Sequence, residues 1–349
     1  MGANFDREFT RAGIWNWEKP RIEDEIRYAQ YAEEAGLDSV WQGESRLVRD
    51  AMTVMGAYTQ ATDEIDIAPG VTNCYTRNVA LMAQTFSTLH ELSGGRTKLG
   101  IGAWWDPLAS KVGVERERPL RRMWEYCTVV KRLLDLETVT YDGDTLGVDG
   151  IELDLVRSEA GPRDVPIYVG ATGETMHKLT GELVGTGVAG GVFMNYLIPP
   201  EHNLKGVEKL REGVEKQGGE LADVDRPQLI AVSMDEDADR AIDEARGLAT
   251  QYIGQQPHIT KASGIDEERA ALVKEELGGW PATAADIERA SEHVSDDVVT
   301  NIVAAGTPDD VIDRVRDYCE AGCTEPVVYP LTDNMEEVID AMAEAKAEG

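Results

Sequence analysis

Two glutamates are the side chains of this sequence best suited to acid catalysis. Glu44 follows the short apolar run of residues 39–42, and Glu18 follows an earlier run over residues 9–15. A carboxyl group at the end of a strand could donate a proton to a bound substrate, provided that burial keeps it protonated. We take Glu44 as the first candidate and Glu18 as the second. For each, the alternative is a solvated surface glutamate.

A short glycine-rich loop could bind an anion. Gly170, Ala171, Thr172 and Gly173 lie between a β-rich run and a predicted helix. Backbone N–H groups and the positive end of a helix dipole favour a phosphate at such a position, and the hydroxyl of Thr172 adds a donor. We therefore predict an anion site in this loop.

Several polar side chains also follow predicted strands. Thr72, Asn73 and Asn195 could hydrogen-bond the edge of a polar heteroaromatic ring, although each could instead cap its own loop. Arg77 could meet an anionic substrate tail or cofactor, or pair with a local acid. These four residues are candidates for ligand binding.

Aromatic and metal-ligating residues give weaker signals. Trp104 and its neighbour Trp105 could stack on a ligand or lie partly in the core. Of the five histidines, only His90 lies loosely near a strand end, and it falls within a predicted helix, so we predict no catalytic histidine and no metal site. Cys319 and Cys323 are predicted to be buried apolar residues.

The elements that position these residues alternate between short strands and amphipathic helices. This pattern is typical of parallel strands joined by helical crossovers. No Gly-x-Gly-x-x-Gly motif follows the first strand, which disfavours an open doubly wound sheet. We predict an α/β fold, a (β/α)8 TIM barrel with its active site at the C-terminal ends of the strands. The eight strands are predicted over residues 9–15, 39–42, 65–71, 97–101, 165–170, 190–194, 228–234 and 326–330.

The 349 residues fit one barrel domain with two insertions. After a long helix over residues 116–136, a polar segment at about 138–160 carries turn signals and predicts a hairpin. Residues 238–293 have little strand character and predict two or three helices. We expect a single domain over 1–349.

The sequence is strongly acidic, with 65 Asp and Glu against 34 Lys and Arg and a net charge of −31. Such self-repulsion is screened in concentrated salt, where the Debye length falls to about 3 Å at 1 M. We predict a salt-adapted protein, the alternative being an ordinary acidic one. Nucleic acid is excluded as a partner by charge. The sequence predicts no membrane span and no secretory signal, so we expect a cytoplasmic protein.

Ordered strings along the chain resemble the bacterial-luciferase-like superfamily. They include YAEEAGLDSVW at residues 31–41, APGVTNCYTRN at 68–78 and TLHELSGGRTKLGIGA at 88–103, and similarity continues through 166–182, 232–237 and 305–322. The resemblance covers roughly residues 9–331. Within the superfamily, the chain most resembles the deazaflavin-dependent methylenetetrahydromethanopterin reductases, in a haloarchaeal form.

This resemblance implies a cofactor, coenzyme F420 or alternatively FMN, with its ring in the barrel mouth against a bulge that ends the third strand. It points to Gly70–Val71 as a non-prolyl cis peptide behind the ring, the alternative being a plain turn. It also implies a homodimer or homotetramer. The cofactor-binding residues that we predict are Gly70, Val71, Thr72, Asn73, Gly170, Ala171, Thr172, Gly173 and Asn195, and the substrate-binding residues are Trp15, Trp104 and Arg77.

The chain departs from the reductase pattern at two places. The family's Gly-Ile-Glu string on the first strand reads Gly-Ile-Trp here, with Trp15 in place of a glutamate that is thought to donate a proton. The acid–histidine pair after the second strand is altered to Glu44-Ser45, while Arg49-Asp50 still matches. These changes leave the proton donor and the exact substrate open, and Glu44 at the predicted mouth of the barrel is the first candidate for the donor.

The resemblance implies an F420-dependent oxidoreductase of one-carbon metabolism that transfers a hydride and acts on a CH–NH or CH–OH group. The substrate would be pterin-like or folate-like, as in a 5,10-methylenetetrahydrofolate or methylenetetrahydromethanopterin reductase. Two alternatives stay open, an FMN-dependent luciferase-like monooxygenase and a non-catalytic barrel that serves as a binding protein.

Overall fold

A computed structural model describes residues 5–16, 20–155 and 161–348, and its contacts divide the chain into two units. The larger unit comprises Ile14–Met194 and Gly206–Pro227, and the smaller unit comprises Met1–Gly13, Asn195–Lys205 and Gln228–Gly349. Both units are interrupted in sequence. The expectation of a single domain over 1–349 stays a prediction.

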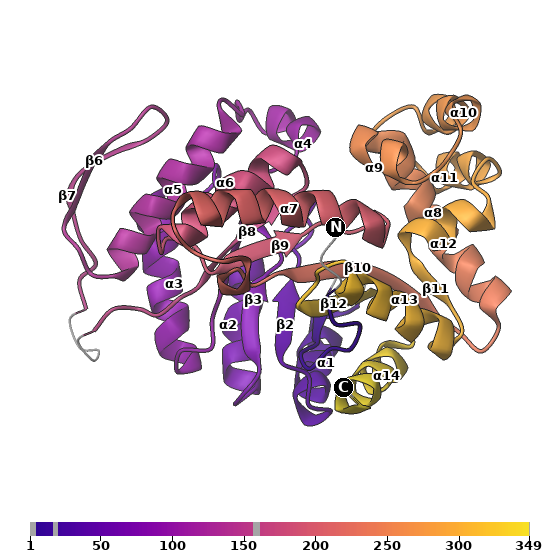
Figure 1. The fold of residues 1–349 in the computed structure, drawn as a ribbon, viewed down its shortest axis with the longest axis horizontal. Coiled ribbons are helices and arrows are strands. Elements are labelled where there is room, and N and C mark those ends of the chain that lie inside the picture. Colours follow the sequence, from indigo (N-terminus) through magenta and orange to yellow (C-terminus); the bar gives the residue numbers. More distant parts are fainter. Residues whose placement is uncertain (1–4, 17–19, 156–160, 349) are drawn as a thin grey trace. The chain divides into compact units, whose positions relative to one another are not determined.

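The larger unit is built on parallel strands (Figure 1), and almost all of their residues are buried. Strand β2 pairs with β3, β4 with β5, β5 with β8, and β8 with β9, all in parallel. A further parallel bridge joins Ile67 to Thr97, so β3 also lies beside the segment that leads into β5. Such strands read as nearly continuous apolar runs, which is why the sequence located them. Their bounds are β1 (Gly13–Asn16), β2 (Ser39–Gln42), β3 (Asp66–Pro69), β4 (Thr72–Asn73), β5 (Leu99–Gly102), β8 (Ile167–Ala171) and β9 (Gly191–Met194).

Capping residues set the ends of the helices in this unit. Asp50 accepts a hydrogen bond from the backbone of Thr53 at the start of α2, and Asn78 does the same for Leu81 at the start of α3. The left-handed Gly94 ends α3 at the predicted glycine pair. The helices are α1 (Ile22–Glu34), α2 (Ala51–Ala61), α3 (Val79–Ser93), α4 (Asp106–Lys111), α5 (Pro119–Leu134) and α6 (Glu174–Gly185), while α7 (Pro200–Lys216) carries residues of both units and precedes the 3-10 turn η1 (Leu221–Asp223).

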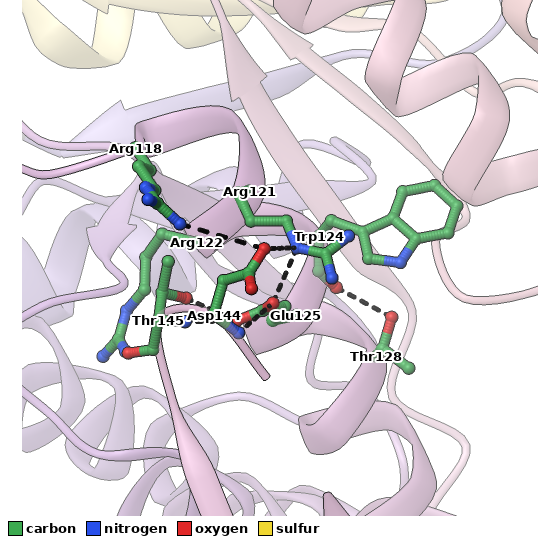
Figure 2. Close-up of polar contacts among 8 residues, drawn as sticks. All are labelled: Arg118, Arg121, Arg122, Trp124, Glu125, Thr128, Asp144 and Thr145. Atoms are coloured by element: carbon green, nitrogen blue, oxygen red, sulfur yellow. Dashed lines mark hydrogen bonds and ion pairs between the residues drawn. The ribbon is translucent and has the colours of Figure 1, made fainter. Parts of the chain in front are cut away.

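An antiparallel hairpin follows α5, where the sequence predicted one. It consists of β6 (Val139–Asp142) and β7 (Gly147–Ile151), and its turn is held by the buried carboxylate of Glu125 (Figure 2). That carboxylate accepts from the backbone N–H of Asp144 at 2.8 Å and of Thr145 at 2.9 Å. Burial opposes the charge, but these hydrogen bonds lower the pKa of Glu125 to about 2. The carboxylate therefore fastens the turn to α5.

The smaller unit combines three strands with a set of helices. Strand β10 pairs in parallel with β11, and Leu331, just past β12, donates to Val232 of β10 at 2.8 Å. Thr307 caps α13 and Pro308 occupies its first turn, as predicted. The elements are β10 (Pro227–Met234), α8 (Ala238–Gln255), α9 (Pro257–Ala262), α10 (Glu267–Leu277), α11 (Ala284–Ser291), α12 (Asp296–Ile302), β11 (Ala304–Gly306), α13 (Pro308–Glu320), β12 (Glu325–Pro330) and α14 (Met335–Glu348).

The segment at 238–293, which the sequence predicts as a helical insertion, contains more helices than predicted. It contains four helices, α8 to α11, rather than two or three, because the short α9 begins only two residues after α8 ends. Cys319 and Cys323 are buried, as expected. None of the helices that the structure describes is long and apolar enough to cross a membrane.

Candidate active site

Glu44 and Thr72 come together at the C-terminal ends of the strands in the larger unit. Glu44 lies two residues beyond β2, and its carboxyl accepts a hydrogen bond from the hydroxyl of Thr72 in β4. Burial raises the pKa of Glu44, whereas the Thr72 hydroxyl and the charge of Arg77 act in the opposite direction. The net effect is a raised pKa, which is the direction of shift that a general acid requires.

Trp15 lies against the loops that follow β2 and β3. Its side chain is 5% exposed, and its indole N–H donates to the carbonyl of Gly70 at 2.8 Å. A Cβ atom at Gly43 would lie 2.6 Å from the indole ring, and one at Gly70 would lie 2.8 Å from Nε1. Glycine at both positions is therefore required by the close approach of the indole. The substrate-binding role of Trp15 stays a prediction.

Val71 lies in the bulge that ends the third predicted strand, between β3 and β4. The Gly70–Val71 peptide is cis, as the resemblance implied. The methyl groups of Val71 face three glycines of the neighbouring strands, and Cβ atoms at Gly100, Gly102 and Gly170 would lie 3.1, 2.9 and 3.0 Å from them. The sequence analysis missed Gly100 and Gly102. Their signal was two glycines within one apolar strand, which is typical of close approach by another group.

Asn73 and Arg77 take local partners, which were the alternatives left open by the sequence. The Asn73 side-chain oxygen accepts from the backbone N–H of Tyr75 at 3.0 Å and of Thr76 at 2.9 Å. Arg77 forms an ion pair with Asp50, the N-cap of α2. Binding of a ligand by Asn73 or Arg77 stays a prediction.

The predicted anion loop lies at the end of β8 and leads into α6. Gly170 and Ala171 are the last residues of β8, and Gly173 is the N-cap of α6. Thr172 and Gly173 are exposed, and among the described residues no side chain caps this helix. Open N–H groups at a helix N-terminus are what an anion site needs. His177, which the sequence analysis passed over, contacts the Gly173 carbonyl through Nδ1 at 3.0 Å.

The tryptophan pair lies between β5 and α4. Trp104 is half-buried and has a φ of 61°, while Trp105 is the residue that precedes α4. The guanidinium carbon of Arg46 lies 5.8 Å from the centre of the Trp105 ring, within the range of a cation–π contact. Stacking of Trp104 on a ligand stays a prediction. Glu18, the second candidate acid, lies outside the described residues.

Asn195 belongs to the smaller unit, where it contacts a histidine. Its side-chain nitrogen lies 3.3 Å from Nε2 of His258, and its carbonyl accepts from Gln228 at 3.0 Å. Burial and the neighbouring His202 lower the pKa of His258, so a neutral ring can accept the Asn195 hydrogen bond. The sequence gave no signal for His258, because the two partners are 63 residues apart.

Several known proteins are similar to this chain over most of its length. The sequence model of the luciferase-like monooxygenase family matches residues 8–325. A 5,10-methylenetetrahydromethanopterin reductase of Archaeoglobus fulgidus is 31% identical over 301 residues, which are 86% of this chain and 87% of that protein. An F420-dependent glucose-6-phosphate dehydrogenase of Amycolatopsis mediterranei is 25% identical over 326 residues, 88% of each chain.

A solved structure confirms the predicted fold. The coenzyme F420 dependent tetrahydromethanopterin reductase of Methanopyrus kandleri matches with a TM-score of 0.84 at 26% identity and covers 97% of this chain and 98% of its own. The α/β fold is therefore a luciferase-like (β/α)8 TIM barrel, as the sequence predicted.

Proposed function

Because this chain belongs to the luciferase-like monooxygenase family, we propose that it is a coenzyme F420-dependent oxidoreductase that reduces a 5,10-methylene-tetrahydropterin or -tetrahydrofolate. The relatives at 31% and 25% identity are both oxidoreductases, and the second is named as F420-dependent. The observation that carries the proposal is the Glu44–Thr72 pair, a carboxyl with a raised pKa just beyond the end of β2. This acid suits a substrate whose reduction needs a proton on nitrogen.

The residues of the larger unit fit a phosphorylated deazaflavin. The uncapped N-terminus of α6 and the loop from Gly170 to Gly173 offer N–H groups to a phosphate. The indole of Trp15 packs against Gly70 and donates to its carbonyl, which fixes the backbone that would lie behind a flat ring. When bound, the reduced deazaflavin supplies the hydride.

The chain's own contribution is to position the substrate and to hold a proton. Opening of a methylene bridge between two nitrogens needs a proton on one of them, and the Glu44 carboxyl is the group that holds it. The Thr72 hydroxyl fixes the orientation of that carboxyl. Hydride transfer itself depends mainly on placing donor and acceptor carbons in contact.

Cofactor titration tests the proposal. The purified protein in molar KCl is titrated separately with coenzyme F420 and with FMN, and binding is followed by quenching of cofactor fluorescence. We expect tight binding of the deazaflavin alone, and oxidation of reduced F420 when a methylene-tetrahydropterin or methylene-tetrahydrofolate is added. Tight binding of FMN would favour the monooxygenase alternative, and binding of neither would favour the non-catalytic barrel.

A further inference from the structure

We propose that Tyr58 is a positioning residue that, through Gln42, fixes the backbone that carries Glu44. The inference rests on the proposed role of Glu44 as the proton donor, because it concerns how that carboxyl is held. Tyr58 lies in the C-terminal half of α2, and Gln42 is the last residue of β2. Both residues are fully buried, so their polar groups must find partners within the protein.

Gly43 joins the end of β2 to Glu44, and both of its backbone groups are hydrogen-bonded. Its N–H donates to the Asn16 carbonyl at 3.2 Å, and its carbonyl accepts from Nε2 of Gln42 at 3.3 Å. Glycine has more backbone freedom than any other residue, so these two bonds restrict the peptide that leads into Glu44. The Thr72 hydroxyl holds the carboxyl at the other end of the Glu44 side chain. The position of this carboxyl therefore depends on the Gly43 backbone as well as on Thr72.

The hydrogen bonds that lead to Gly43 have one possible direction. The Asn16 side-chain nitrogen donates to the Glu25 carbonyl at 3.1 Å and to the Tyr58 hydroxyl at 3.0 Å. A carbonyl only accepts, so the contact with Glu25 fixes which end of the Asn16 amide carries the NH2 group. The Tyr58 hydroxyl therefore donates its own proton to Oε1 of Gln42, at 2.6 Å. This bond turns the NH2 group of Gln42 toward the Gly43 carbonyl.

Loss of the Tyr58 hydroxyl would release the Gln42 side chain without moving the strand. A phenylalanine keeps the buried ring but leaves Oε1 of Gln42 without its donor, so the amide can turn over. Oε1 would then face the Gly43 carbonyl, which is also an acceptor, and the bond to Gly43 would be lost. The Gln42 backbone carbonyl accepts from the Gly70 N–H at 2.8 Å, which holds the end of β2 in place. The expected consequence is a displaced Glu44 carboxyl in a folded protein.

Two variants and one matched control test this arrangement. Tyr58→Phe removes the hydroxyl, and Gln42→Met, of similar length, removes the amide that it orients; Gln42→Met carries the same test should Tyr58→Phe fail to fold. The control is Tyr168→Phe, in which a buried tyrosine loses a hydroxyl that donates to Asp225 at 2.8 Å. Tyr168 pairs with Gly191, the first residue of β9, so it lies toward the N-terminal ends of the strands.

Amide hydrogen exchange at Gly43 is the readout that needs neither cofactor nor substrate. Tyr58→Phe and Gln42→Met should each raise this exchange rate by about tenfold or more, while Tyr168→Phe leaves it native. With F420 and the methylene substrate, kcat should fall by about tenfold to hundredfold in the same two variants, since a displacement of about 1 Å can cost about 10²-fold. The dissociation constant for F420 should stay native.

Combination with Glu44→Gln separates positioning from general damage. If Tyr58 acts through Glu44, Tyr58→Phe lowers kcat in the native background and causes no further loss in Glu44→Gln. An equal loss in both backgrounds, or native Gly43 exchange in Tyr58→Phe and Gln42→Met, would overturn the inference. Native turnover in Glu44→Gln would instead overturn the assignment of Glu44 as the acid. The exchange measurement is read independently of that result.

Discussion

Replacement of Glu125 by glutamine is expected to destabilise the β6–β7 hairpin by about 2–3 kcal/mol. One carboxylate oxygen of Glu125 accepts from Arg121 Nε at 2.7 Å and from the Asp144 N–H, and the other accepts from the N–H and hydroxyl of Thr145 (Figure 2). A glutamine must turn its NH2 group toward one of these two sets. The Thr145 hydroxyl can rotate to accept, but the Thr145 N–H then loses its acceptor.

The magnitude follows in two ways. An unpaired buried N–H costs about 1–3 kcal/mol, and the remaining bonds lose their charge assistance. Independently, a pKa of about 2 for Glu125 against an ordinary 4.5 corresponds to about 3 kcal/mol, an upper value because Arg121 is 49% exposed and solvent screens its part. Both routes lead to about 2–3 kcal/mol.

Amide hydrogen exchange at Asp144 and Thr145 measures this loss directly. The matched control is Arg121→Ala, which removes an exposed ion-pair partner and should cost less than about 1 kcal/mol. Because the pKa of Glu125 is lower in the folded protein, its stabilisation is fully present above about pH 4.5 and is lost as the pH falls toward 2. The difference between native protein and Glu125→Gln should therefore shrink on acidification. Native exchange rates in Glu125→Gln, or an equal loss in Arg121→Ala, would refute the reasoning.

Glu44→Gln should lower kcat by about 10²–10⁴-fold while the dissociation constant for F420, measured by fluorescence, stays native; equal losses in both would assign Glu44 to binding. Gly173→Leu should weaken F420 binding by about tenfold or more. The urea midpoint should not change, since a Cβ at Gly173 meets no described atom within 4 Å. A native affinity for F420 would contradict the assignment of this loop as an anion site. Gly100→Ala should prevent native folding, because its Cβ would lie 2.0 Å from the Pro69 carbonyl oxygen, whereas Gly56→Ala in α2 should raise the free energy of unfolding by about 0.5–1 kcal/mol; circular dichroism in urea compares them. Dialysis below about 0.5 M salt should lower the melting temperature, and an unchanged value would contradict salt adaptation.

Most strands of the main sheet could be predicted because they are buried along most of their length. Residues 39–42 were predicted as they are found, and the strands that begin at 167 and 191 were located within two residues. Strand β11 was missed because its sequence, Ala-Ala-Gly, carries no β-branched or aromatic residue, and its position depends on pairing with β10. Helix α4 was missed because six residues give too short a stretch for a helical period.

The candidate site was only partly predictable. Parallel topology brings the ends of β2 and β4 to one edge, so Glu44 and Thr72 could each be proposed from their positions. The ion pair between Arg77 and Asp50 could not be predicted, because it depends on the path of the loop after β2. In that loop Arg46 and Leu47 take positive φ values of 51° and 62°, which non-glycine residues rarely adopt. Side-chain partners across loops are set by such backbone paths.

Trp15 supports the backbone that carries Glu44, the proton donor that we propose. The indole of Trp15 is fixed by its hydrogen bond to the Gly70 carbonyl, and it leaves no room for a Cβ at Gly43. Gly43 is the residue before Glu44, and its N–H donates to the Asn16 carbonyl at 3.2 Å, so the backbone that carries Glu44 is tied to the end of β1. A glutamate at position 15 would be smaller and would lack the N–H donor, leaving this backbone without its packing surface. A large, rigid side chain at position 15 therefore supports the loop after β2, which carries the proposed proton donor Glu44.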